Sequence, residues 1–248
     1  MAVRQHPARR TGPVESLSEH AYRLIRDQLL RGRYSLGAAL SRRQLASEMQ
    51  MSFVPISEAL QRLELDGLVE SKPRVGTRVR VPTPQSIRER YGLREALETQ
   101  AARLCVENAG EREREELRNM GTKLDRLYAK SAGSDEDSLY AARTCHMKFH
   151  LRVAELGGNT LLRHAIEREQ VLVFNWLFDT ASQQRSLPAL FHTELAGILT
   201  GHSTEAADRA MRAHVWYGLE HVIEALGAVA DESGWRLARG GRGSSRAR

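Results

Sequence analysis

Four of the nine histidines are spaced so that their rings could meet inside one helical bundle. His146 and His150 are four residues apart in a segment with helical periodicity, so their side chains lie one above the other. Apolar residues share that face, which therefore points toward a core. His192 and His214 lie on similar apolar stripes of two further segments. Histidines from three helices could thus bind a divalent metal; the alternative for each is a hydrogen-bonded core residue.

A histidine-ligated metal could also support hydrolysis, so an enzyme is a second hypothesis. Three or four histidines can hold a metal-bound hydroxide in a hydrolase or lyase attached to a DNA-binding module. However, the segment with His146 and His150 lacks the glutamate of a His-Glu-x-x-His motif, and four protein ligands would close a tetrahedral site. We therefore predict no catalytic residue and no enzymatic activity.

The charge is unevenly distributed along the 248 residues. Residues 1–82 hold 14 Lys and Arg against 8 Asp and Glu, residues 83–235 hold 18 against 23, and residues 236–248 hold 5 Arg and no acid. A basic head on an acidic body is typical of a polyanion-binding module joined to a second domain. The alternative is an ordinary solvated surface with a basic end, and a sequence-blind architectural DNA-binding protein would show the same charge.

The first part of the chain has the pattern of a winged helix-turn-helix. Residues 1–14 are polar and basic and predict a disordered arm, and residues 15–82 form the predicted DNA-binding domain. Helices are predicted from Leu17 to Arg31, from Ser41, whose partner Gln44 suggests a capping box, and around Pro55. Residues 68–72 and 77–81 alternate as strands of a β-hairpin wing. Three short helices and a basic hairpin fit this motif.

The rest of the chain predicts an all-helical effector-binding and dimerisation domain, residues 83–235, followed by a flexible basic tail, residues 236–248. The fold class is therefore mostly α, with a C-terminal antiparallel bundle of six or seven helices. Neither a signal peptide nor an apolar run of about 20 residues is present, so we predict a cytoplasmic protein without a membrane partner. The predicted helices are 85–109, 111–131, 135–156, 160–183, 188–200 and 204–229.

Two groups of residues carry a resemblance to a known family. The runs Leu40–Ala46 and Glu58–Val69 resemble the N-terminal domain of the GntR family. Phe149-His150, Gly158-Asn159 with Leu161-Leu162, and Ala210–His214 resemble the FCD effector domain of its FadR subfamily. Together the two matches cover about four fifths of the chain. The resemblance implies a homodimer that binds a short palindromic DNA operator, in most cases as a repressor, and responds to a small metabolite, often a carboxylate.

The resemblance also suggests which residues of the helix-turn-helix contact DNA. Arg43 matches a family arginine that meets DNA, although a solvated surface charge is its alternative. Phe53 and Ser57 stand where the family usually has arginines, so the operator should differ from the usual one. Phe53 could pack on a thymine methyl or, equally, inside the domain. Ser52 and Gln61 are further candidate contacts, with exposed helix surface as the alternative for Gln61.

The predicted wing adds a basic cluster beside the recognition helix. Lys72, Arg74 and Arg78, with Arg80, suit contact with phosphates or the minor groove. Gly76 permits a turn that other residues resist. A hairpin edge protected by charge is the alternative.

In the family, metal ligands are an Asp-x-x-x-His pair and two later histidines. His150, His192 and His214 fall on the histidine positions, while His146 occupies the aspartate position. An all-nitrogen site favours zinc or nickel over manganese or magnesium.

Two further residues match family positions near the effector pocket. Arg94 could pair with an effector carboxylate, or form an i,i+4 ion pair with Glu98. Asn159 could contact the effector, or cap the helix that follows Gly158.

Overall fold

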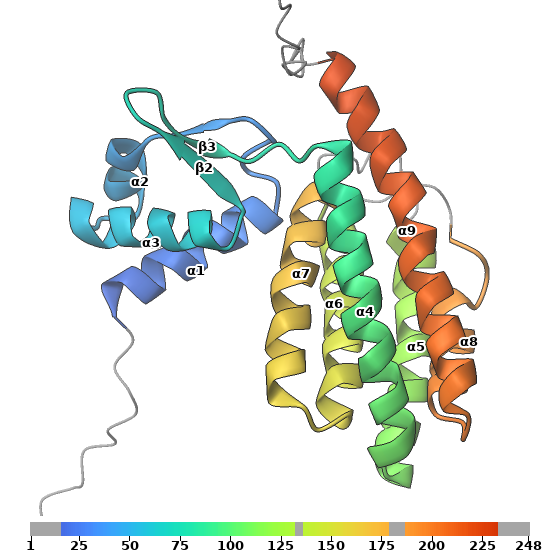
Figure 1. Ribbon diagram of the computed structural model, residues 1–248. Coiled ribbons are helices and arrows are strands. Elements are labelled where there is room, and N and C mark those ends of the chain that lie inside the picture. The colour runs from blue at the N-terminus through green and yellow to red at the C-terminus, as the bar shows by residue number, and fades with distance from the viewer. Residues whose placement is uncertain (1–15, 132–135, 179–186, 233–248) are drawn as a thin grey trace, which may run out of the picture. The chain divides into compact units, whose positions relative to one another are not determined.

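The computed structural model describes residues 16–131, 136–178 and 187–232. These residues form two compact units (Figure 1). One holds residues 16–29 and 37–80, and the other holds residues 30–36 and the described residues from 81 onward. The predicted arm, residues 1–14, and the predicted tail, residues 236–248, lie outside the described residues.

Helices and a small sheet build the first unit, as the winged helix-turn-helix pattern predicted. The helices are α1 (Leu17–Leu30), α2 (Arg42–Glu48) and α3 (Phe53–Leu65). The strands β1 (Ala39–Leu40), β2 (Val69–Lys72) and β3 (Gly76–Val79) pair antiparallel in the order β1-β3-β2. Strand β1 was not predicted, because two residues carry no alternating pattern.

A tight turn joins α2 to α3. Ser41 begins α2 by accepting a hydrogen bond from the backbone of Gln44 at 3.3 Å. The side chain of Gln44 donates to Glu48 instead, so the predicted capping box is only half formed. After α2, Gln50 adopts the left-handed conformation, with φ 53°, that turns the chain into α3. One side of α3 is buried, and its members are Pro55, Ile56, Ala59, Leu60 and Leu63.

The second unit is all-helical in its described residues. Its helices are α4 (Pro84–Asn108), α5 (Glu111–Ser131), α6 (Glu136–Leu156), α7 (Thr160–Phe178), α8 (Phe191–Leu199) and α9 (Thr204–Glu232). Each starts and ends close to a predicted range, and the end of the range 160–183 falls beyond the described part of α7. None of the described helices is long and apolar enough to span a membrane.

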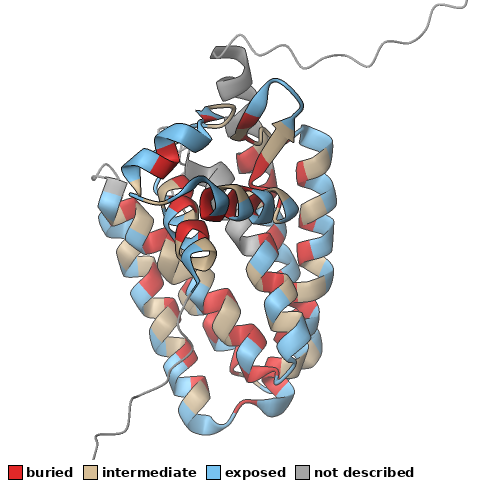
Figure 2. Ribbon diagram, turned by 90° about the vertical axis from the view of Figure 1, so that its left-hand side faces the viewer, coloured by how far each residue is buried: buried red, intermediate tan, exposed pale blue. Residues whose placement is uncertain are grey.

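The helices of this unit pack as a bundle around the long helices α4 and α9. These two lie side by side, α4 also contacts α6 and α7, and α5 packs between α6 and α8 (Figure 1). Figure 2 shows buried residues on the inward side of each helix. Thr83 begins α4 with a complete capping box to Ser86, and Pro84 fills the first helical position.

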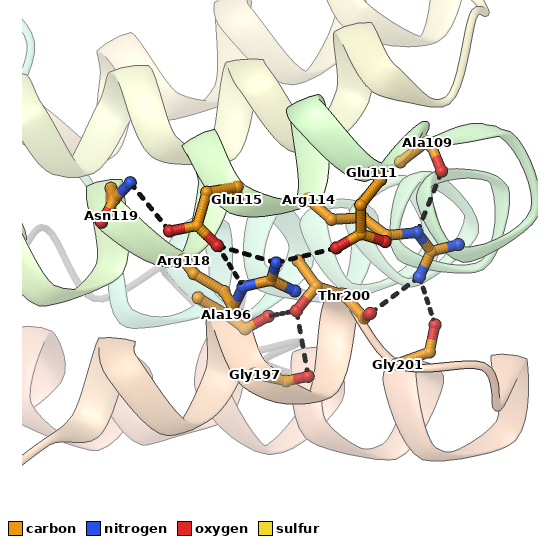
Figure 3. A network of polar contacts seen from close by, with 10 residues as sticks. All are labelled: Ala109, Glu111, Arg114, Glu115, Arg118, Asn119, Ala196, Gly197, Thr200 and Gly201. Carbon is orange, nitrogen blue, oxygen red and sulfur yellow. Dashed lines mark hydrogen bonds and ion pairs between the residues drawn. The ribbon is translucent and has the colours of Figure 1, made fainter.

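A buried arginine near the start of α5 joins three helix ends (Figure 3). Arg114 donates to the carbonyl oxygens of Val106 and Ala109 at the end of α4, at 2.8 and 3.0 Å. It also donates to Thr200 at 2.7 Å and to Gly201 at 2.5 Å, at the end of α8. These carbonyls lie at helix C-termini, where the backbone dipole favours a cation. Arg114 therefore holds α8 against the end of α4.

Candidate metal centre and nucleic-acid interface

The four predicted histidines lie together in the bundle. His146 and His150 come from α6, His192 from the first turn of α8 and His214 from α9. The Nε2 atom of His146 lies 2.8 Å from that of His150 and 3.1 Å from that of His214, and 3.1 Å separates the last two. Ligand nitrogens of His146, His192 and His214 all lie within 4.8 Å of one another. The inward stripes thus bring four rings to one place.

Two carboxylates orient the rings. Glu98 of α4 places its Oε2 atom 2.5 Å from Nδ1 of His150, and Asp125 of α5 accepts a hydrogen bond from Nδ1 of His192 at 2.8 Å. Asp125 also accepts from the backbone N–H groups of His192 and Thr193, so it caps α8. A neutral imidazole that donates from Nδ1 keeps a lone pair on Nε2. Both carboxylates therefore aim a lone pair into the cluster.

Aromatic rings complete the walls of the cluster. The hydroxyl of Tyr128 lies 3.2 Å from Nδ1 of His146, and its ring stacks on His192 with centroids 5.4 Å apart. Phe191 stacks on His214 with centroids 4.8 Å apart. These contacts restrict the rotation of the imidazoles.

A glycine lets α8 approach α5 closely enough to deliver His192. A Cβ atom on Gly121 would lie 2.6 Å from the carbonyl oxygen of His192 and 2.8 Å from the Cβ atom of Ala196. Real Cβ atoms do not reach such distances, so no larger residue fits while α8 keeps its place.

The protonation of the cluster suits a metal ion. Burial lowers the pKa of His192 to about 4, and burial with repulsion between imidazoles lowers the pKa of His146 and His214 well below the usual value. The rings of His146, His192 and His214 are therefore neutral near pH 7 and can donate lone pairs. The Nε2 atom of His192 is buried without a hydrogen-bond partner in the described part of the chain. These residues fit a divalent cation, and an all-nitrogen donor set suits zinc or nickel.

The two predicted effector residues have structural partners. Nε of Arg94 donates to Glu98 at 2.8 Å, and both side chains are buried. The i,i+4 ion pair that was one alternative for Arg94 is therefore present. Because Glu98 also contacts His150, this pair links α4 to the cluster. Asn159 is exposed and accepts a hydrogen bond from the backbone of Leu162 at 3.0 Å, so it caps α7.

A second buried arginine lies beside the cluster and was not predicted. Arg143 is 3% exposed and precedes His146 by three residues, which puts both on the same face of α6. Burial lowers the pKa of Arg143 to about 10, and its charge acts on the hydroxyl of Tyr128. Arg143 shares a helical stripe with His146, and this spacing could have identified it. Arginines are seldom buried, however, so the stripe alone did not suggest an inward side chain.

The predicted contacts on the helix-turn-helix lie on accessible surface. Arg43, Ser52 and Gln61 are exposed, and Ser57 is half-buried. Phe53 is 53% exposed, so it does not fill the core of its domain. This exposure favours contact with a thymine methyl over packing inside the domain, and the DNA contact stays a prediction.

The predicted wing residues surround the turn between β2 and β3. Lys72 and Arg74 are exposed, and Arg74 adopts a left-handed backbone with φ 65°. Gly76 has φ 102°, a conformation that only glycine adopts readily. Arg78 is half-buried, and its Nε lies 3.9 Å from Glu70 across the hairpin. The tip therefore presents Lys72 and Arg74 most freely.

The fold and the cluster together define a class of protein. A winged helix-turn-helix joined to a helical domain with an internal histidine cluster is the architecture of two-domain transcription regulators. Residues 17–79 match the model of the bacterial regulatory proteins of the gntR family, and residues 89–216 match the FCD domain. The chain belongs to the GntR family and carries an FCD domain.

Similar proteins agree with this assignment. The chain is 29% identical over 206 residues to the "Probable D-xylose utilization operon transcriptional repressor" of Paenarthrobacter nicotinovorans, covering 82% of this chain and 87% of the other. It is 26% identical over 207 residues to the HTH-type transcriptional regulator YdhC of Bacillus subtilis, covering 83% and 90%. The solved structure of E. coli McbR/YncC has the same fold, with a TM-score of 0.70, 22% identity, and coverage of 85% and 99%.

Proposed function

We propose that this protein is a homodimeric repressor of the FadR subfamily whose affinity for a DNA operator changes when a small carboxylate-bearing metabolite binds in the bundle. The metabolite would bind at a divalent metal, zinc or nickel, held by His146, His150, His192 and His214. The observation that carries this proposal is the convergence of these imidazoles. The Nε2 atoms of His146, His150 and His214 lie 2.8–3.1 Å apart, and ligand nitrogens of His146, His192 and His214 lie within 4.8 Å of one another.

A metal ion bound there would supply positive charge. Four histidines fill a tetrahedral site, so a carboxylate would bind as a fifth ligand, to which a zinc site can expand. The chain's own residues would do the rest. Glu98 would orient the ring of His150 and Asp125 that of His192, through the contacts described above. The buried guanidinium group of Arg143 supplies a fixed charge on the same face of α6, and it favours an anionic ligand over a neutral one.

The change in DNA affinity would follow from a difference in affinity for the metabolite between two states of the dimer. A metabolite shifts DNA affinity only by as much as it prefers one state over the other. The helix-turn-helix would contact DNA through Arg43, Ser52, Ser57 and Gln61, and the wing through Lys72, Arg74, Gly76 and Arg78. The observations in favour are the exposure of α3 and the basic hairpin tip.

The metal half of the proposal is tested by elemental analysis of the purified full-length protein. We expect about one zinc or nickel ion per chain, lost in a variant with both His150→Ala and His214→Ala. The matched control is His164→Ala, which removes an exposed imidazole of α7 and should leave the metal content unchanged. Metal-free wild-type protein after growth with zinc and nickel would refute this half.

The regulatory half is tested by DNA binding. We expect the protein to retard a specific duplex at moderate salt and a carboxylate metabolite to change that affinity. Sequence-blind binding would favour an architectural protein instead. Ester or phosphate hydrolysis abolished by His150→Ala would favour the enzyme hypothesis, although Glu98 and Asp125 already hold histidines and are poorly placed as general bases.

A further inference from the structure

Two large apolar side chains are exposed at the start of the recognition helix. Phe53 and Val54 form the first turn of α3 and are 53% and 64% exposed. Exposing both has a free-energy cost that a bound partner could recover, because burying apolar surface is favourable in water. Their position is informative, because the first turn of a recognition helix is the part that enters the major groove.

The exposed face of α3 carries apolar side chains in the first turn and uncharged polar side chains in the turns that follow. Val54, Ser57 and Gln61 are three and four residues apart, so they share one face, and Phe53 borders it one turn before Ser57. The charged residues of α3 lie elsewhere. Glu58 accepts a hydrogen bond from Ser18 of α1, and Arg62 pairs with Glu19 of the same helix. Glu64 accepts a hydrogen bond from the backbone of Ser71 in β2.

Exposed positive charge lies on the elements that pack against α3 and on the hairpin tip next to them. Arg42 and Arg43 are exposed at the start of α2, and Lys72 and Arg74 are exposed at the hairpin tip. Residues 16–80 hold 11 Lys and Arg against 7 Asp and Glu. Charge complementarity therefore selects a polyanion as the occupant. Double-stranded DNA is the polyanion that also offers an apolar group to a helix, because thymine places its 5-methyl group in the major groove.

We infer that Phe53 and Val54 determine operator specificity by packing against thymine 5-methyl groups in the major groove. This inference rests on the proposed DNA-binding function and adds its sequence preference. Instead of bidentate hydrogen bonds to guanine, the first turn of α3 makes apolar contacts to thymine, so A·T pairs occupy the operator positions that it faces. Ser57 and Gln61 follow on the same face and contribute polar contacts.

The test changes single methyl groups in the DNA. The full-length protein first selects operators from duplexes with about 25 randomised base pairs, which span two half-sites. Each thymine of the selected operator is then replaced by deoxyuridine, which lacks only the 5-methyl group. We expect at least one position per half-site at which uracil weakens wild-type binding by about fourfold, the effect of burying one methyl group.

Protein variants assign the contact. In Phe53→Ala or Val54→Ala, uracil and thymine should bind equally at the position that the lost side chain contacts, since a double-mutant cycle isolates the pair. Arg74→Ala is the matched control: it should weaken both duplexes equally and leave the uracil effect intact. Both apolar residues are exposed, so their replacement should not unfold the domain.

Three outcomes would overturn the inference, and they are distinguishable. If a specific operator is selected but uracil has no effect at any position, DNA binding stands and the thymine contact is refuted. If the alanine variants keep normal DNA affinity but change the oligomeric state in sedimentation, a second copy covers the patch. If no sequence is enriched, the proposed regulatory function fails together with the inference.

Discussion

Replacing Arg114 should destabilise the bundle more than replacing any exposed arginine of the same helix. The side chain makes four hydrogen bonds to carbonyl oxygens of α4 and the end of α8, at 2.5–3.0 Å. Figure 3 shows the three to Ala109, Thr200 and Gly201. Hydrogen bonds from a charged donor contribute about 1.5–3 kcal/mol each, and burying the guanidinium group costs several kcal/mol. In Arg114→Met the carbonyls also lose their partner. We expect the free energy of unfolding to fall by about 4 kcal/mol.

Urea unfolding of the full-length protein measures this loss. Residues 1–80 contain no tryptophan, and Trp216 lies in α9, so its fluorescence reports on the bundle. Arg112→Met is the matched control because Arg112 is exposed two residues away, and it should change the stability by less than about 0.5 kcal/mol. Arg114→Lys keeps the charge but not the fork that reaches two helix ends.

The stability of the two methionine variants and of Arg114→Lys separates the fork contacts of Arg114 from its charge. A loss below about 1 kcal/mol in Arg114→Met, or equal losses in both methionine variants, would show that the carbonyl contacts stabilise the bundle no more than a surface charge does. Full stability in Arg114→Lys would show that charge near the helix ends, and not the fork geometry, is what matters.

Three shorter predictions concern other positions. Gly121→Ala should shift α8, destabilise the bundle by about 1–3 kcal/mol and lower the metal content of the protein. Gly197→Ala is the control, because a Cβ atom there meets nothing within 4 Å, and it should change neither the stability nor the metal content. Urea unfolding and metal analysis measure both variants. Burial and the hydrogen bond to Asp66 raise the pKa of Tyr22 to about 12 from 10. The stabilisation that the protonated hydroxyl gives is therefore present below pH 10 and is lost between pH 10 and 12. Wild-type protein should therefore lose about 1 kcal/mol relative to Tyr22→Phe between pH 9 and 11, measured by circular dichroism during unfolding, and parallel curves would contradict this. Burial raises the pKa of the Cys105 thiol to about 11, so it should react slowly at pH 8. In a Cys145→Ser variant, a thiol reagent should label Cys105 rapidly only after urea unfolds the chain.

Local patterns were enough to predict the helices and the direction of the histidines. Apolar residues at helical spacing, caps such as Thr83 and breaks at glycine depend on neighbours within a few positions, so they can be read along the chain. The same spacing directed His146 and His150 inward. It did not reveal β1, which has two residues and exists only because β3 pairs with it.

The sequence by itself determined the two-domain architecture and the four inward histidines. Only the tertiary structure decided which groups complete the site, because Glu98 meets His150 and Asp125 meets His192 across 52 and 67 residues of chain. It also showed a buried ion pair between Arg94 and Glu98 and an exposed Phe53 side chain, while the effector contact of Arg94 and the DNA contact of Phe53 stay predictions. Periodicity tells which face a residue shares, whereas its partner depends on how separate helices pack, which no local pattern encodes.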